Sequence, residues 1–128
     1  MDHIQQIAAL ALNAAHTSEG RLLVYSEVDD GVVSADLFSQ LQGEPVRYRF
    51  SSNDLIAAIY RYWQSEEVAK RWATMALVIE GGRFTIDFQY AESIRADEAL
   101  YERRPRVIRS YFGDAIVDYS SPNAAVVS

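Results

Sequence analysis

The Gly81-Gly82 pair constrains the fold more than any other feature of the sequence, because it separates two runs of good strand formers. The runs extend over residues 72–80 and 83–91. A two-residue turn predicts an apolar face that pairs Ile79 with Phe84, Leu77 with Ile86, Met75 with Phe88 and Ala73 with Tyr90. The opposite face pairs Glu80 with Arg83, Val78 with Thr85, Ala76 with Asp87 and Thr74 with Gln89. A slip of one residue would bury the polar side chains and expose the phenylalanines, so the sequence specifies one register.

A second hairpin is predicted nearer the N-terminus, where Asp29-Asp30-Gly31 separates two further strands. If Asp30-Gly31 is the turn, the core face pairs Val28 with Val33, Ser26 with Ala35 and Val24 with Leu37. The other face pairs Glu27 with Ser34 and Tyr25 with Asp36, and it is polar and acidic. A third strand over residues 46–50 extends the same meander.

Helical spacing of apolar residues predicts helices before, between and after the hairpins. Asp2 is the expected cap of the first helix, whose apolar positions are Ile4, Ile7, Ala8, Ala11 and Ala15. A capping-box pattern of Ser51 and Asp54 begins a second helix, which runs from about Asn53 to Ser65. The third helical segment, residues 97–109, contains Pro105, which either begins a second short helix or kinks one helix.

The order of elements is therefore helix, three strands, helix, two strands, helix. This order predicts the α+β class, with an antiparallel sheet of about five strands and the helices packed on one face. We expect a single domain over residues 1–119 and a flexible C-terminal tail over residues 120–128. The sheet face that the helices leave uncovered becomes the candidate contact surface.

The charge of the chain bears on its partners. There are 18 acidic and 12 basic residues, for a formal net charge of −6. Such a charge opposes nonspecific binding to nucleic acid and to anionic membranes and favours a basic partner, although it also simply keeps a small protein in solution. The absence of cysteine suits a reducing compartment. Because no basic leader precedes an apolar segment and no apolar run reaches the ~20 residues of a membrane span, we expect a cytoplasmic protein.

The residues that could carry chemistry are few. His3 and His16 are the only histidines, and their separation does not fit a zinc site on one helix. The sequence contains no nucleophile elbow and no phosphate-binding glycine loop. Asp36 and Asp87 lie in mid-strand, where a sheet could bring them together for acid–base catalysis, but polar positions on an open sheet face explain them better. We therefore expect a binding protein that is not an enzyme and uses no cofactor or metal.

A local basic segment, Arg103 to Arg109, is the one feature that points toward nucleic acid. It contains Arg103, Arg104, Arg106 and Arg109. One interpretation is a small regulatory or RNA-binding module that uses this segment. The interpretation that we favour, given the acidic balance of the chain, is a helix whose arginines pair with the protein's own carboxylates.

The hairpin sequence Phe84-Thr85-Ile86-Asp87-Phe88-Gln89-Tyr90 after the Gly-Gly turn, followed by Tyr101-Glu102-Arg103-Arg104, resembles the YezG-like family of bacterial immunity proteins. The order of helices and strands is also similar to that family. The resemblance implies a small α+β antitoxin that binds and neutralises a cognate polymorphic toxin, commonly a nuclease, made by the same cell. It implies inhibition by acidic side chains that cover the positive groove for nucleic acid, without a cofactor.

Strand alternation then selects the candidate contacts with the toxin. Four come from the sheet face expected to be open, and two from the tip of the first hairpin. They are Tyr25, Glu27, Asp36 and Asp87, with Asp29 and Asp30 at the tip. Glu80 is expected to be occupied by Arg83 instead.

Overall fold

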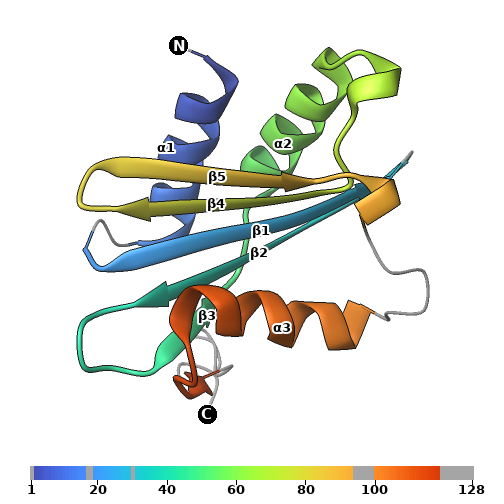
Figure 1. Cartoon of the computed structure of the whole chain (residues 1–128). Coiled ribbons are helices and arrows are strands. Elements are labelled where there is room, and N and C mark those ends of the chain that lie inside the picture. The colour runs from blue at the N-terminus through green and yellow to red at the C-terminus, as the bar shows by residue number, and fades with distance from the viewer. Residues whose placement is uncertain (1, 17–18, 30, 94–99, 119–128) are drawn as a thin grey trace.

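The computed structural model of the chain describes residues 2–16, 19–29, 31–93 and 100–118. Its helices are α1 (His3–Ala15), α2 (Asn53–Ser65) and α3 (Leu100–Phe112), with short 3₁₀ turns at Val68–Lys70 and Ala91–Ser93. Its strands are β1 (Arg21–Asp29), β2 (Val32–Gln40), β3 (Val46–Arg49), β4 (Thr74–Glu80), β5 (Arg83–Gln89) and β6 (Val117–Asp118). They form one sheet in the order β5-β4-β1-β2-β3-β6, and Figure 1 shows this sheet between the helices. The α+β class and the predicted order of elements are confirmed.

Both hairpin registers are confirmed. In the β4–β5 hairpin, Ile79 pairs with Phe84 and Ala76 with Asp87, and the ladder ends at Thr74 and Gln89. In the β1–β2 hairpin, Tyr25 pairs with Asp36. The short strand β6 was not predicted from the sequence, and it pairs in parallel with β3 at the far edge of the sheet. The predicted tail over residues 120–128 and the turn residue Asp30 lie outside the described residues.

The two N-terminal helices cover one face of the sheet. The buried side chains of α1 are Ile7, Ala8, Ala11 and Ala15, and those of α2 are Leu55, Ala58, Ile59 and Trp63. Asp2 caps α1 as predicted, and its carboxylate accepts a hydrogen bond of 2.8 Å from the amide of Gln5. The cap of α2 is Ser52 and not Ser51, because the Ser52 hydroxyl accepts from the Leu55 amide at 3.1 Å. Ser52 lies three residues before Leu55, which is the spacing at which an N-cap side chain reaches a free amide of the first helical turn.

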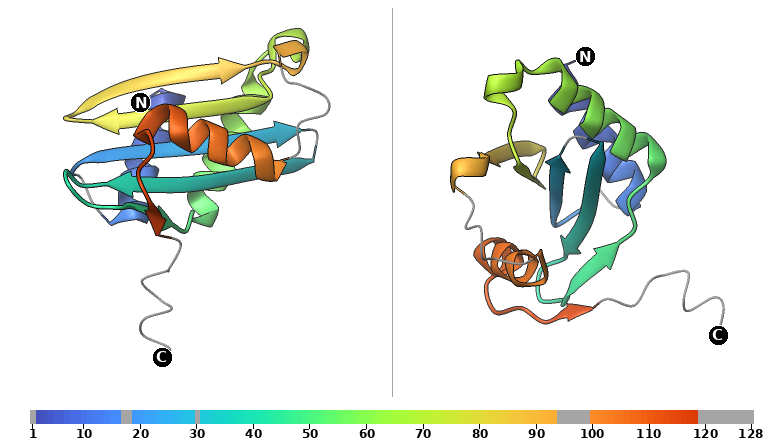
Figure 2. Two further views of the ribbon diagram at one scale, coloured as in Figure 1. Left: turned by 60° about the horizontal axis from the view of Figure 1, so that its bottom comes forward. Right: turned by 90° about the vertical axis from the view of Figure 1, so that its right-hand side faces the viewer.

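The third helix lies on the opposite face of the sheet, over β1 and β2 (Figure 2). The prediction that all helices pack on one face is therefore wrong for α3. Ile108 and Phe112 of α3 are buried against a second core. The sheet contributes Leu23, Tyr25, Phe38, Val46, Ala76 and Val78 to this core. Because those apolar side chains would otherwise face water, the second face also needs a helical cover.

Pro105 lies inside α3 and does not divide the helix. Proline removes one amide donor from the helical ladder, a loss that an exposed side of a packed helix tolerates. Pro105 is exposed, whereas Ile108 is buried three residues later. The expected alternative of a second short helix that begins at Pro105 is therefore wrong. Among the described helices, none is both long and apolar enough to cross a membrane.

Candidate functional site

The acidic face of β1 is held by α3. The guanidinium of Arg103 pairs with one carboxylate oxygen of Glu27 at 2.7 Å, and the Tyr25 hydroxyl donates to the other at 2.7 Å. The side chains of Arg103 and Glu27 are only 13% and 20% exposed. Burial raises the pKa of the Tyr25 phenol, and the hydrogen bond to Glu27 raises it further. Both carboxylate oxygens of Glu27 are therefore bound by side chains of the protein itself.

Asp36 of β2 is engaged in the same way. Its Oδ2 atom pairs with a guanidinium nitrogen of Arg104 at 3.1 Å, and its Oδ1 atom accepts from the Tyr48 hydroxyl at 3.1 Å. Asp36 is 8% exposed. A carboxylate that is this buried is expected to have a charged partner and further hydrogen bonds, and both are present.

The third carboxylate beneath α3 belongs to Asp87 of the edge strand β5. Its Oδ2 atom accepts a hydrogen bond of 2.8 Å from the hydroxyl of Tyr111, near the end of α3. Burial raises the pKa of Tyr111 to about 12, and the hydrogen bond to Asp87 and its negative charge contribute. Unlike the other two carboxylates, Asp87 remains exposed to solvent.

Asp36 and Asp87 do not form a catalytic pair. The register aligns Asp87, Ala76, Tyr25 and Asp36 in one row across β5, β4, β1 and β2. Because neighbouring strands lie about 4.8 Å apart, the two aspartates are separated by roughly 14 Å. Each carboxylate is instead held by a different side chain of α3.

The predicted open face is therefore a covered face. Tyr25 and Asp36 are buried, and Glu27 is largely buried, so these three cannot form the expected contact surface. Asp29 and Asp87 are exposed, and Asp30 lies outside the described residues. The signal for the cover was present in the sequence, because Leu23 and Phe38 oppose each other on the same face as the acids. Two large apolar side chains in that position require something to pack on them.

The arginine segment serves mainly as the complement of that acidic face. Arg103 and Arg104 pair with Glu27 and Asp36, which confirms that these two arginines bind the protein's own carboxylates. Arg109 lies at the surface, 3.9 Å from Asp114. Arg103 and Arg104 thus form ion pairs within the fold.

Glu80 has a different partner from the predicted one. Arg21 of β1 holds it with two contacts of 3.2 Å, from Nε to Oε2 and from a terminal nitrogen to Oε1. Arg21 also donates to the backbone carbonyl of Tyr111. Glu80 is therefore bound by a strand neighbour on its other side, and this interaction also secures the end of α3.

A partly exposed aromatic cluster at one end of the sheet was not predicted. We call it the aromatic end, and it consists of His3, Tyr62, Trp72, Phe88 and Tyr90. Tyr62 is central, with its ring centroid 5.4 Å from that of His3, 6.3 Å from Trp72 and 6.2 Å from Phe88. Trp72 is buried, whereas Tyr90 is 37% exposed.

Carboxylates border the aromatic end. Burial raises the pKa of Tyr62, and the negative charges of Glu66 and Asp2 raise it further, as does Tyr90. These residues come from the start of α1, the end of α2 and the end of β5. Sequence reasoning missed the cluster because its members are scattered along the chain and only the packing of α1 and α2 on the sheet brings them together.

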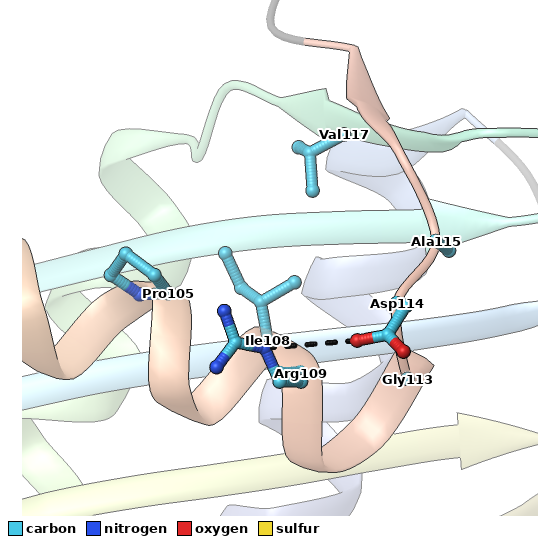
Figure 3. Close-up of a pocket in the computed structure, with 7 residues that line it drawn as sticks. All are labelled: Pro105, Ile108, Arg109, Gly113, Asp114, Ala115 and Val117. Carbon is cyan, nitrogen blue, oxygen red and sulfur yellow. Dashed lines mark ion pairs between the residues drawn. The ribbon is translucent and has the colours of Figure 1, made fainter.

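Three cavities of the described residues have volumes of about 240, 270 and 310 Å³. The cavity of about 240 Å³ lies between α3 and the chain that leads to β6. Figure 3 shows its lining, which includes Pro105, Ile108 and Val117. The Arg109–Asp114 ion pair lies at this cavity. Ligand pockets are commonly about 300–1,000 Å³, so this cavity falls below the usual range. The described residues contain no group of three or more His, Asp or Glu that could hold a metal ion.

Comparison with models of known protein families finds no match, and comparison with curated proteins finds none either. The resemblance to the YezG-like family therefore stays a prediction.

Proposed function

We propose that the protein is an immunity protein that binds and inhibits a cognate bacterial toxin, a nuclease, by covering its basic active-site or substrate surface. The observation that carries this proposal is the aromatic end, a cluster of aromatic side chains bordered by carboxylates. Tyrosine and tryptophan are among the residues that most often anchor protein interfaces, and flanking carboxylates complement a basic partner.

Tyr62 and Tyr90 are suited to act as anchors. Tyr62 is half-buried and packs against Trp72 and Phe88, so its ring is held in place before any partner binds. A side chain that is already ordered loses little conformational entropy on binding. Tyr90 is 37% exposed and is close enough to Tyr62 to influence its pKa.

The distribution of charge supports a basic partner. The pairs Glu27–Arg103 and Asp36–Arg104 each sum to zero, so the whole net charge of −6 is carried by the other residues. Of the predicted contacts, Asp29 and Asp87 remain at the surface, and Glu66 and Asp2 border the aromatic end. An acidic surface speeds association with a basic protein and makes the rate dependent on salt.

Co-expression tests the proposal. The proposal predicts that the gene lies directly downstream of a toxin gene. The partner to use is the toxin domain encoded there, expressed from a tightly repressed promoter in cells that also produce this protein. We expect protected growth and co-purification of the two chains. Toxicity that this protein does not relieve, together with failure to co-purify, would reject the proposed function.

A further inference from the structure

The strand β5 lies at one edge of the sheet. It is the terminal strand of the sheet, with β4 on one side and no strand on the other among the described residues. Edge strands are usually blunted by shortness, proline, a bulge or charged side chains, above all lysine, since free amide and carbonyl groups attract another strand, and the only charges of β5 are the opposite pair Arg83 and Asp87. The seven residues of β5, Arg-Phe-Thr-Ile-Asp-Phe-Gln, include neither proline nor lysine. Phe84 within it is 45% exposed.

The turn fixes which backbone groups are free. In a two-residue hairpin, the residues that flank the turn, here Glu80 and Arg83, exchange hydrogen bonds. Alternation along β5 then directs the amides and carbonyls of Arg83, Thr85 and Asp87 toward β4. Those of Phe84 and Ile86 point outward. A new antiparallel strand must therefore bond through these outward residues.

The side chains of β5 are complementary to those of a second β5. Arg83 and Asp87 are four residues apart on one face of the strand, with Thr85 midway between them. An antiparallel pair whose two-fold axis passes through Thr85 places Arg83 of each copy opposite Asp87 of the other. On the other face, the same register places Phe84 opposite Ile86. Opposite charges and apolar side chains in directly opposed positions stabilise a strand pair.

The alternative registers lack this match. An axis at Ile86 places Asp87 opposite Thr85, and it leaves Arg83 opposite Gln89. An axis at Asp87 places the two Asp87 carboxylates opposite each other, which is repulsive. Charge therefore selects one register among those that the backbone allows.

We propose that the protein forms a two-fold dimer in which two β5 strands pair antiparallel about Thr85 and join the two sheets into one. The partner is a second copy of this chain, and the pairing goes beyond toxin binding and does not depend on it. Each dimer contains two Arg83–Asp87 pairs and buries the exposed ring of Phe84.

Charge-reversed variants of Arg83 and Asp87 test the proposal. The mass of each variant in solution is measured by light scattering coupled to size-exclusion chromatography. The wild-type chain is expected to have twice the monomer mass of 14.4 kDa. Arg83→Asp and Asp87→Arg each place like charges opposite one another, and both are expected to give monomers. The double variant Arg83→Asp/Asp87→Arg again places opposite charges opposite each other and is expected to restore the dimer. Arg61→Asp makes the same charge change on the exposed surface of α2 and is expected to leave the dimer intact.

A cysteine at the axis gives a second, independent readout, because the chain has no cysteine of its own. Thr85 would face Thr85 of the second copy as a non-hydrogen-bonded pair, with Cα atoms about 4.5 Å apart, a distance that a disulfide spans. Thr85→Cys is therefore expected to form a covalent dimer under mild oxidation. Gln89→Cys lies on the same face but far from the axis and is expected to stay uncrosslinked. A monomeric wild-type chain, or equal crosslinking of the two cysteine variants, would overturn the proposal.

Discussion

Arg103 of α3 and Glu27 of β1 form an ion pair of 2.7 Å that attaches the last helix to the acidic face of the sheet. Both side chains are shielded from solvent, and the residues are 76 positions apart in the sequence. The pair explains why an apparently exposed acidic face is internal. It also gives one arginine of this helix a buried partner within an acidic protein.

Removing the charge of Arg103 should destabilise the fold. Arg103→Met keeps the aliphatic stem but leaves Glu27 without its main charged partner, so the free energy of unfolding is expected to fall by about 2 kcal/mol. Urea denaturation followed by circular dichroism measures the change. Arg109→Met is the matched control, because its side chain is 71% exposed and its ion pair is 3.9 Å long. An equal loss in both variants would show that the Arg103 pair has no special role.

The contributions of Arg104 and Asp36 to the free energy of unfolding should be coupled. A double-mutant cycle of Arg104→Met and Asp36→Asn isolates their interaction, and we expect a coupling free energy of about 1 kcal/mol. The partial exposure of Arg104, at 33% of its side chain, keeps the expected value modest. Additive effects of the two substitutions would contradict a direct interaction.

Alkaline pH should weaken the fold through Tyr111. Its pKa is about 12 in the folded protein and about 10 in the unfolded chain, so the native state retains its proton where the unfolded state has lost it. The stabilisation is complete below pH 10 and is lost as the pH rises toward 12. We expect Tyr111→Phe to show a smaller decline in unfolding free energy over this interval than the wild type. Parallel declines in the two proteins would exclude a role for Tyr111.

Two glycines with similar backbone conformations should respond differently to alanine. Gly20 and Gly31 have φ angles of 76° and 79°, which cost an alanine roughly 1 kcal/mol at either position. A Cβ atom at Gly20 would also collide with the backbone carbonyl of Gln40, whereas one at Gly31 meets open space. Gly20→Ala should therefore lower the melting temperature more than Gly31→Ala, and equal effects would argue against the close approach of Gly20 to Gln40.

The hairpins were predictable in detail because side chains alternate along a strand, and a register error would turn Leu77 and Phe88 away from the core under α1 and α2. The side of the sheet that α3 covers was not, because Tyr25, Glu27 and Asp36 alternate with apolar residues and resemble a solvent-facing row. Their partners, Arg103 and Arg104, are distant in sequence, so the acidic residues themselves do not indicate a cover. The signal for it is the apolar pair Leu23 and Phe38 on the same face. The two-residue strand β6 is too short for any periodic signal.

The dissociation constant between this protein and the toxin domain, compared between two charge-reversed variants, tests the central claim most directly. Glu66→Lys reverses a charge beside the aromatic end, and Glu44→Lys reverses an exposed charge beyond β2, at the opposite end of the sheet. Calorimetry is expected to show a dissociation constant raised about tenfold by Glu66→Lys, which corresponds to about 1.4 kcal/mol, and less than about twofold by Glu44→Lys. Equal effects of the two substitutions, or no binding by the wild-type protein, would contradict a toxin-binding role for the aromatic end.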